Sequence, residues 1–426
     1  MQFEASAAFA RQLDAADELA SFRTEFLIPE RNGAAQIYFL GNSLGLQPRQ
    51  TAQHLQQVLD QWAQWGVEGF FMGSDPWLHY HDKLVEPLAN IVGALPSEIV
   101  VMNSLTVNLH LLLVTFYQTA GKRTKILCEA KAFPSDQYLL ETHVRQRGFD
   151  PADVIIEVQP EDGQTEITTA AILAAIDQHR DSLALVFWGG VNYYTGQAFD
   201  MQSITSAAHD AGALCGFDLA HAAGNISLQL HDWNVDFAAW CSYKYLNSGP
   251  GAIAGCYIHQ RYHKDDSLQR FAGWWGYQKE TRFLMQKGFV PIASAEGWQL
   301  STPSPLLYAV HFAALQIFAQ AGMDRLATKG QQLSDYLHFL LQQIERANKG
   351  LLHIITPSSA KGCQVSILVP HIGKQVFQYI TDKGVFADWR EPDVIRVAPV
   401  SLYNTFEEVF LFCQYLEEGL AAASAK

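Results

Sequence analysis

An aspartate, a histidine and a lysine follow two apolar segments in the middle of the chain. Asp218 closes segment 214–218 and is followed by His221, and Lys244 comes just after the apolar segment 237–241. If both segments are strands of a parallel sheet, the carboxylate and the amine reach the same edge, where open α/β proteins bind ligands. The interval between them has room for a strand, a short crossover and a second strand.

This pairing of side chains suggests one chemistry. A carboxylate that keeps a ring nitrogen protonated, together with an amine that bonds to an aldehyde, is what pyridoxal phosphate requires. Taken alone, however, an Asp at a strand end is often a loop residue or helix cap, and a single Lys is usually solvated. The two residues therefore leave both interpretations open, and the rest of the chain has to decide between them.

The surrounding elements favour an α/β fold with a mainly parallel sheet. Apolar segments alternate with amphipathic ones through the middle of the chain, which is typical of strands covered by helices on both faces. The predicted strands are 125–129, 154–159, 183–190, 214–218, 237–243 and 252–259, and helices are predicted at 135–147, 168–179 and 201–211. Further helices are expected at 5–20, 50–65 and 107–117.

The C-terminal part has a different pattern. A long helical region runs from about residue 303 to 348, and strands near 364–369 and 394–397 precede a closing helix from 405. We expect three units: an N-terminal segment, 1–50, that packs with a small domain; a large domain, 51–310, that carries the site; and a small α+β domain, 311–426.

Composition describes an ordered protein of ordinary globular type. The chain has 426 residues, of which 49% are hydrophobic and 17% charged, with a net charge of −14. Such an acidic balance argues against non-specific binding to nucleic acid or anionic membranes. No signal peptide or membrane span is expected, which predicts a cytoplasmic location. The six cysteines form no CxxC pair, and the histidines show no metal-binding spacing, so no metal site is predicted.

Two polar clusters lie where predicted elements meet. Ser104 and Thr106 precede an apolar helix, where they could cap its free N–H groups or leave those groups to bind phosphate. Phe133 follows a strand where an aromatic could stack on a flat ring, whereas Asp136 could simply cap the helix 137–147. Both interpretations remain open for each cluster.

Three further features carry weaker signals. Arg396 lies within the apolar strand 394–397, where it needs either a substrate carboxylate or a protein acid as partner. Trp274 lies in a glycine-flanked loop, which suggests a ligand or subunit contact, or only a small hydrophobic cluster. Gly249, Gly251 and Gly255 do not form a dinucleotide fingerprint, because a strand rather than a helix follows them.

Taken together, these segments resemble kynureninase, a pyridoxal-phosphate enzyme of fold type I. The matching segments span almost the whole chain and are 38–45, 105–110, 133–136, 194–197, 218–222, 240–247 and 395–399. Single segments are shared with relatives such as the cysteine desulfurases, whereas the whole set is specific to kynureninase. The resemblance implies a seven-stranded, mainly parallel sheet flanked by helices, with a smaller α+β domain.

The resemblance also implies roles for individual residues. Lys244 would hold the cofactor covalently and then act as base, Asp218 would pair with the ring nitrogen, and Tyr243 would be the proton donor. The implied cofactor-binding residues are Leu105, Thr106, Phe133, Pro134, Ser135, Asp136, Asp218, His221, Tyr243, Lys244, Trp274 and Thr302. The implied substrate-binding residues are Arg396, for the α-carboxylate, with Asn42, Phe70 and Thr302.

The implied reaction is hydrolysis of the C–C bond of L-kynurenine, giving anthranilate and L-alanine, in tryptophan catabolism or in NAD biosynthesis. A homodimer is implied, with Trp274 reaching the phosphate of its own or of the neighbouring subunit. Some family members carry Ser where this chain has Gly189. Animal members carry polar residues that recognise a 3-hydroxyl group where Phe70 and Thr302 align. Because Phe70 cannot donate a hydrogen bond, we expect a preference for kynurenine over 3-hydroxykynurenine.

Two alternatives remain at this point. A cysteine desulfurase would need a mobile nucleophilic cysteine, for which Cys363 is the only candidate outside a clear strand or helix. A non-catalytic pyridoxal-phosphate binding protein would not need to keep both Lys244 and Arg396.

Overall fold

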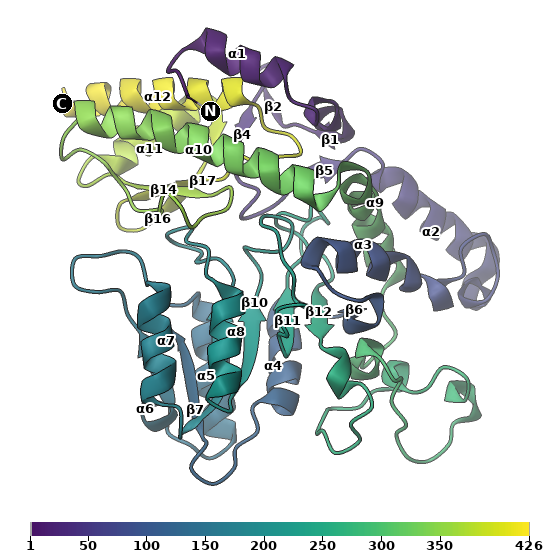
Figure 1. The fold of residues 1–426 in the computed structure, drawn as a ribbon. Helices are drawn as coiled ribbons and strands as arrows, with labels where there is room; N and C mark the ends of the chain where they lie inside the picture. The colour runs from purple at the N-terminus through teal and green to yellow at the C-terminus, as the bar shows by residue number, and fades with distance from the viewer. Residues whose placement is uncertain (1, 426) are drawn as a thin grey trace.

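The computed structural model describes residues 2–425, and its larger part is built around a seven-stranded sheet (Figure 1). Only β12 runs antiparallel to its neighbours, which confirms the predicted mainly parallel sheet. In spatial order the strands are β6 (Ile99–Val101), β12 (Gly255–Ile258), β11 (Phe237–Trp240), β10 (Leu214–Asp218), β9 (Leu183–Gly189), β7 (Lys125–Glu129) and β8 (Ile155–Val158). The three-residue strand β6 was not predicted, because so short a segment carries no pattern.

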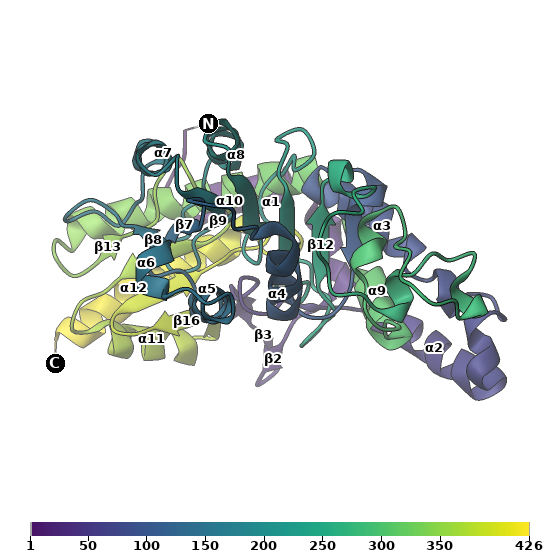
Figure 2. The same ribbon diagram turned by 90° about the horizontal axis from the view of Figure 1, so that it is seen from below.

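Helices cover both faces of this sheet. Figure 2 shows α7 (Thr169–Gln178) and α8 (Met201–Asp210) on one side of the strands, and α4 (Leu105–Phe116) and α5 (Pro134–Gln146) on the other. A short helix, α6 (Pro151–Val154), precedes β8. The central strands are apolar along their whole length because both faces are buried, so their sequences show no alternation.

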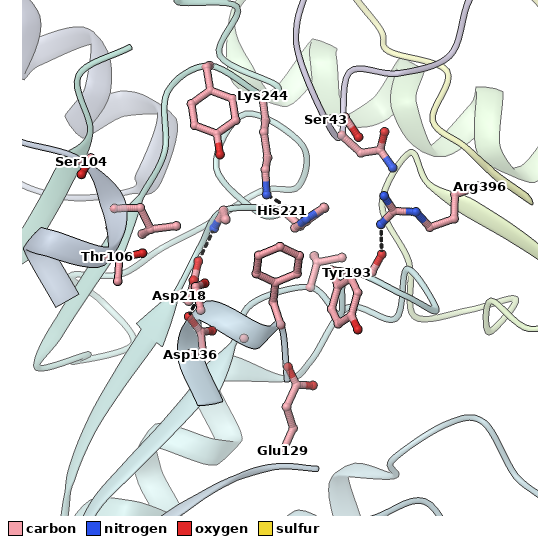
Figure 3. A pocket seen from close by; sticks show the side chains of 18 of the residues that line it. Ser43, Ser104, Thr106, Glu129, Asp136, Tyr193, Asp218, His221, Lys244 and Arg396 are labelled. Atoms are coloured by element: carbon pink, nitrogen blue, oxygen red, sulfur yellow. Dashed lines mark hydrogen bonds between the residues drawn. The ribbon is translucent and has the colours of Figure 1, made fainter. Parts of the chain in front are cut away.

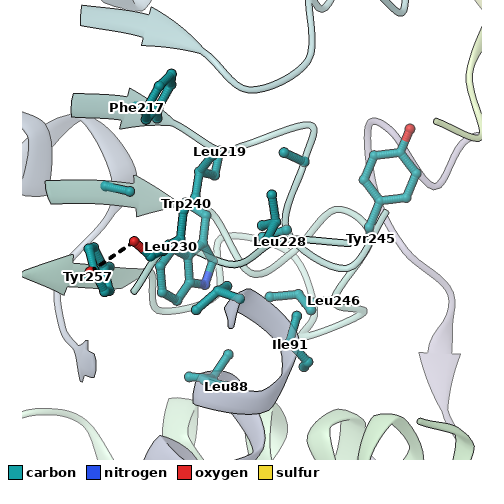
Figure 4. Packing of buried hydrophobic residues seen from close by; sticks show 14 of the residues in the cluster. Leu88, Ile91, Phe217, Leu219, Leu228, Leu230, Trp240, Tyr245, Leu246 and Tyr257 are labelled. Carbon is teal, nitrogen blue, oxygen red and sulfur yellow. Dashed lines mark hydrogen bonds between the residues drawn. The ribbon is translucent and has the colours of Figure 1, made fainter. Parts of the chain in front are cut away.

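The core behind the sheet edge is tightly packed. Trp240 is fully buried, and Figure 4 shows it among side chains that include Leu219, Leu230 and Tyr257. The Tyr257 hydroxyl donates to the Leu230 carbonyl at 3.2 Å, so its polar group is satisfied. On the opposite face, Gly216 of β10 lies against the Phe237 ring so closely that a Cβ atom there would overlap the ring. This packing fixes β10 and β11 side by side, and with them the loops that carry the site.

The predicted long helical region after residue 303 consists of two helices. They are α9 (Pro305–Ala321) and α10 (Met323–Ala347), and they meet at an angle of 83°. Gly322 separates them with φ of 78°, a left-handed conformation that glycine adopts without strain. Helix α9 packs on α2 (Thr51–Trp65) and α3 (Asp82–Val92), beside the large sheet.

The C-terminal part forms a second core around a four-stranded sheet. Its strands are β13 (His353–Ile354), β14 (Val365–Leu368), β17 (Val394–Val397) and β16 (Asp388–Arg390), and its helices are α10, α11 (Gly373–Asp382) and α12 (Phe406–Ser424). Helix α12 begins with a capping box formed by Thr405 and Glu408.

The N-terminal segment packs against this second core. Helix α1 (Ala7–Ala15), shorter than the predicted 5–20, lies beside α12 in Figure 1, and Asp14 accepts hydrogen bonds from the first backbone N–H groups of α12 at 2.7 and 2.9 Å. Strand β4 (Ile37–Tyr38) pairs with β15 (Val385–Phe386). Two small ribbons complete the segment, β1 (Phe26–Leu27) with β5 (Gln47–Pro48) and β2 (Glu30–Arg31) with β3 (Ala34–Ala35). The division of the chain into these domains remains a proposal. The packing favours it, with the boundary between the large and the small domain at Gly322.

Among the described residues, no single helix has both the length and the apolar character needed to cross a bilayer. Helices α9 and α10 meet that test only as a pair, and the pair is sharply bent.

Candidate active site

A cavity of about 370 Å³ opens at the carboxyl ends of β7, β9 and β10, between the two cores (Figure 3). Its lining brings together residues that are far apart in the sequence: Asn42, Ser43, Ser104, Leu105, Thr106, Glu129, Phe133, Ser135, Asp136, Gly189, Val191, Tyr193, Asp218, Ala220, His221, Tyr243, Lys244, Arg390 and Arg396. Asp218 is the last residue of β10, whereas β11 ends at Trp240, short of the predicted Tyr243, so Lys244 projects from the following loop. The expected meeting of Asp218 and Lys244 at one sheet edge is confirmed.

Lys244 points into this cavity and contacts His221. Its Nζ lies 3.0 Å from Nε2 of His221 (Figure 3). Burial and the nearby charge of Lys244 lower the pKa of His221 well below its usual value, so the imidazole is neutral. Its Nε2 therefore accepts from the ammonium group, and its buried Nδ1 has no partner among the described residues. His221 thus offers a free polar atom beside the amine.

Asp218 and Asp136 share a proton at the floor of the cavity. Burial raises the pKa of Asp218, while the Ala220 N–H, at 2.7 Å, and the charge of Lys244 oppose the rise. Burial and the neighbouring Asp218 charge raise the pKa of Asp136 further, so Asp136 is the protonated partner and donates to Asp218. The interpretation of Asp136 as a helix cap is wrong, because α5 begins at Pro134 with Phe133 as its N-cap. Proline is favoured at this first helical position.

The opposite wall of the cavity is the first turn of α4. Ser104 is the N-cap, yet its side chain accepts no capping hydrogen bond, so the N–H groups of this turn are not used by a cap. Leu105 and Thr106 of the same turn line the cavity. A helix N-terminus with unused N–H groups is a natural anion site. Tyr243 also lines the cavity, and burial raises its pKa far enough to keep its hydroxyl protonated.

Arg396 lies at the other end of the cavity and is only 1% exposed. It donates to the Tyr193 carbonyl and pairs with the Asp388 carboxylate, while its Nε has no hydrogen-bond partner within residues 2–425. Burial lowers its pKa to about 10, which leaves it charged at neutral pH. Arg396 therefore forms the salt bridge to a protein acid that one of the two interpretations predicted. Its guanidinium group also lines the cavity, as binding of a substrate carboxylate would require. Asn42, also 1% exposed, lines this end and donates to Gln364 at 2.9 Å.

Two known protein families match parts of this chain. Residues 37–365 match the aminotransferase class-V family, and residues 326–416 match the kynureninase C-terminal domain. The chain is 50% identical to a kynureninase of Flavobacterium psychrophilum over 99% of both chains, and 50% identical to one of Stenotrophomonas maltophilia over 95% of this chain and 96% of that one. The chain belongs to the kynureninase family. This confirms the predicted family, hydrolase class and pyridoxal phosphate cofactor.

Solved structures show the same fold. A cysteine desulfurase from Thermococcus onnurineus matches with a TM-score of 0.75 and 18% identity over 91% of this chain and 95% of that one. The desulfurase CsdA from Escherichia coli matches with a TM-score of 0.75 and 14% identity over 96% and 98%. At such low identity these matches establish the predicted fold type I architecture alone.

The cavity of this kynureninase-family protein fits a phosphorylated pyridine aldehyde. Phe133 lines the cavity with 41% of its side chain exposed, which leaves an aromatic face open for a flat ring. Asp218 supplies a carboxylate for a ring N–H, and the turn at Thr106 supplies unused N–H groups for a phosphate. Lys244 would hold the aldehyde carbon. Pro134 does not itself line the cavity, although its neighbour Ser135 does.

Besides Pro134, three residues with roles implied by the kynureninase resemblance do not line this chain's cavity. Phe70 packs edge-on against Trp77, with ring centroids 5.3 Å apart. Trp274 is 44% exposed and its ring meets Phe283, and Thr302 is exposed. None of the three therefore makes its predicted contact with cofactor or substrate at the cavity lining of a single described chain.

Sequence reasoning missed four polar lining residues: Ser43, Glu129, Tyr193 and Arg390. Glu129 ends strand β7 and could have been found by the strand-end argument used for Asp218. Ser43 and Tyr193 lie in or beside segments that carry the kynureninase resemblance. Arg390 carried no signal, since it reaches the cavity only through the pairing of β16 with β17.

Proposed function

We propose that this protein hydrolyses L-kynurenine to anthranilate and L-alanine with pyridoxal phosphate. The observation that carries the proposal is a single cavity with the Lys244 amine at one side and the buried, charged Arg396 at the other. An α-amino acid fits such a pair of groups, with its amine toward Lys244 and its carboxylate toward Arg396. When bound, pyridoxal phosphate would withdraw electrons from the substrate's α-carbon.

The protein's own groups would then move the protons. Lys244, once its amine is free, would take the proton from Cα, and the neutral His221 beside it can accept a hydrogen bond from that amine. After water has added to the γ-carbonyl and the Cβ–Cγ bond breaks to release anthranilate, Tyr243 would donate a proton to Cβ, because its hydroxyl stays protonated at neutral pH. Asp218 would keep the ring nitrogen protonated. The hydrogen bond that protonated Asp136 donates would help to keep Asp218 ionised for this role. Thr106 and the N–H of Leu105 would bind the phosphate.

The test is the reaction of the purified protein with L-kynurenine and added pyridoxal phosphate. We expect anthranilate and alanine in equal amounts. Release of sulfur and alanine from L-cysteine instead would support the desulfurase alternative. That alternative is disfavoured because Cys363 is 2% exposed and burial raises its pKa to about 12, so it is not a ready nucleophile. We expect a Cys363→Ser variant to retain hydrolysis.

We also propose a homodimer that completes the site. Two neighbouring loops expose large apolar side chains, with Phe71 and Phe283 in contact at 5.8 Å between centroids. Leu284 and Met285 beside them are 63% and 69% exposed, which is unusual for a free surface. In a dimer, this apolar surface would be buried and Trp274 could reach the partner's phosphate site. Sedimentation should give twice the chain mass, and a Leu284→Glu substitution should weaken both dimerisation and cofactor binding.

Substrate preference and location belong to the same proposal. Phe70 cannot hydrogen-bond a 3-hydroxyl group, so kcat/KM should be higher for kynurenine than for 3-hydroxykynurenine; the reverse order would contradict this.

A cytoplasmic location is supported by the six cysteines, which are all free and buried, as expected in a reducing compartment.

A further inference from the structure

Glu129 is a third buried acid of the cavity, and the mechanism above leaves it without a role. It is the last residue of β7 and is 5% exposed. Figure 3 shows its carboxyl group directed into the pocket from below, between Asp136 and Tyr193 in this view. A buried carboxyl group at a ligand cavity is costly unless it is paired or protonated, so its place needs a reason.

The position of this carboxyl group is fixed by its neighbours. Asn192 donates to Oε2 of Glu129 at 3.1 Å. Asn192 is itself held by the backbone N–H groups of Tyr194 and Thr195, which donate to its Oδ1 at 2.9 and 2.8 Å. A Cβ atom at Gly189 would lie 2.9 Å from Oε1 of Glu129, so the carboxyl group fills the space that a side chain there would need.

Behind Glu129 lies a second cavity, which we call the rear cavity. It has a volume of about 290 Å³ and is lined by Cys128, Glu129, Ala132, Gln137, Leu140, Glu141, Pro151, Ala152, Ile155 and Glu157. Glu129 belongs to the lining of both cavities. Glu141 and Glu157, which line the rear cavity, are exposed to solvent. The rear cavity therefore gives Glu129 a route to solvent that does not pass through the active site.

The charge that acts on Glu129 is the negative charge of Asp218. Burial raises its pKa to about 7; the Asn192 hydrogen bond opposes this rise, and the Asp218 charge adds to it. Its other titratable neighbours, Tyr193 and Cys128, have pKa values raised by burial and stay neutral. Asp136 faces it as well and is protonated. The cations of the cavity are Lys244, which acts on Asp218, and Arg390 and Arg396 at the far end.

We propose that Glu129 is a proton-exchanging group that shares the charge of this cavity with Asp218 and Asp136. When a ring cation pairs with Asp218, the Glu129 carboxyl group releases its proton to solvent through the rear cavity, so cofactor loading depends on pH. We expect Glu129 to lose a proton, and not to gain one, because its carboxyl group is already buried. The positive charge of the ring then favours the carboxylate form by more than any further loss of water disfavours it. The proposal rests on the proposed cofactor role of Asp218, whose charge acts on Glu129.

The test counts protons rather than turnover. Binding of 4′-deoxypyridoxine 5′-phosphate, which lacks the aldehyde, is measured calorimetrically in two buffers of different ionisation enthalpy, at pH values on both sides of the Glu129 pKa of about 7. Near that pH, we expect the unmodified protein to release up to about one proton more per bound ligand than Glu129→Gln does. Well below and well above that pH, the two proteins should release equal numbers of protons. The matched control Glu157→Gln, on the rear cavity only, should behave like the unmodified protein.

A second variant keeps the proposal testable if Glu129→Gln is unstable. Asn192→Asp retains the oxygen that holds the Tyr194 turn, but it removes the donor to Glu129 and adds a carboxylate. The pH of maximal proton release should therefore rise. An unmoved maximum, or equal proton counts in Glu129→Gln and the unmodified protein, would overturn the proposal. A normal proton profile without anthranilate formation would instead refute only the substrate assignment.

Discussion

Replacing Arg396 with lysine tests how the cavity recognises its substrate. The guanidinium uses Nη1 for the Tyr193 carbonyl and Nη2 for Asp388, while Nε is unpaired. A lysine at this position keeps one positive charge but offers a single nitrogen. It cannot serve the carbonyl, the partly buried Asp388 and a substrate carboxylate with the same geometry. Arg396→Lys should therefore lose at least one charge-assisted hydrogen bond to the α-carboxylate.

The size of the effect follows from that loss. One hydrogen bond to a charged group contributes about 1.5–3 kcal/mol, which corresponds to a rise in KM of about 10- to 150-fold. L-Alanine carries the same amine and carboxylate, so its inhibition constant should rise by the same factor. We expect kcat to change less than KM, because the carboxylate is not a reacting group.

The assay is anthranilate release as a function of kynurenine concentration, with and without L-alanine. Arg390→Lys is a matched control, since Arg390 also lines the cavity and pairs with Asp388 at 3.1 Å but is 38% exposed. Its KM should rise by less than about fivefold, because exposed ion pairs contribute up to about 1 kcal/mol. If Arg396→Lys lowered kcat and left both KM and alanine inhibition unchanged, the assignment of Arg396 would be refuted.

Three other substitutions probe the cofactor site and the fold. Asp218→Asn should raise the dissociation constant of pyridoxal phosphate by about 10- to 150-fold through loss of one charged hydrogen bond, measured by absorbance titration; unchanged affinity would argue against the ring-nitrogen contact. Gly216→Ala should lower the free energy of unfolding by about 1–3 kcal/mol because its Cβ overlaps the Phe237 ring, and a neutral result in urea denaturation would contradict the packing. Burial alone would raise the pKa of Asp236, but hydrogen bonds such as that from His209, at 2.9 Å, lower it below 3.8. Its ionised form thus stabilises the fold above that pH, and this contribution is lost as the pH falls through the lower folded pKa. Asp236→Asn should therefore cost about 1.5–3 kcal/mol at neutral pH and flatten the acid end of the stability profile.

The sheet and the main acid–amine pair could be read from the sequence because they depend on local patterns. Asp218 and Lys244 follow apolar strands, and the carboxyl ends of parallel strands meet at one edge whatever the rest of the chain does. The break at Gly322 was missed because a single glycine within an apolar helical pattern does not by itself end a helix. The helix-cap interpretation of Asp136 failed because Pro134 begins the helix earlier.

The rest of the site depends on contacts across long sequence separations. Arg396 meets Asp388 through the pairing of β16 with β17, whereas its contact with Tyr193 forms only when the small sheet docks onto the large one. The proton shared by Asp136 and Asp218 likewise results from burial in a common cavity. No spacing rule predicts such pairs, since both members look like ordinary polar residues in their own segments.

The central claim is that Lys244 holds the cofactor and supplies the base for kynurenine hydrolysis. Borohydride reduction of the loaded protein, followed by digestion and mass spectrometry, tests it most directly when combined with turnover of Lys244→Ala. We predict that the cofactor is found on the peptide containing Lys244 and that the variant releases no anthranilate at a measurable rate. Labelling of another lysine, or a Lys244→Ala protein that hydrolyses kynurenine as fast as the unmodified one, would contradict the account.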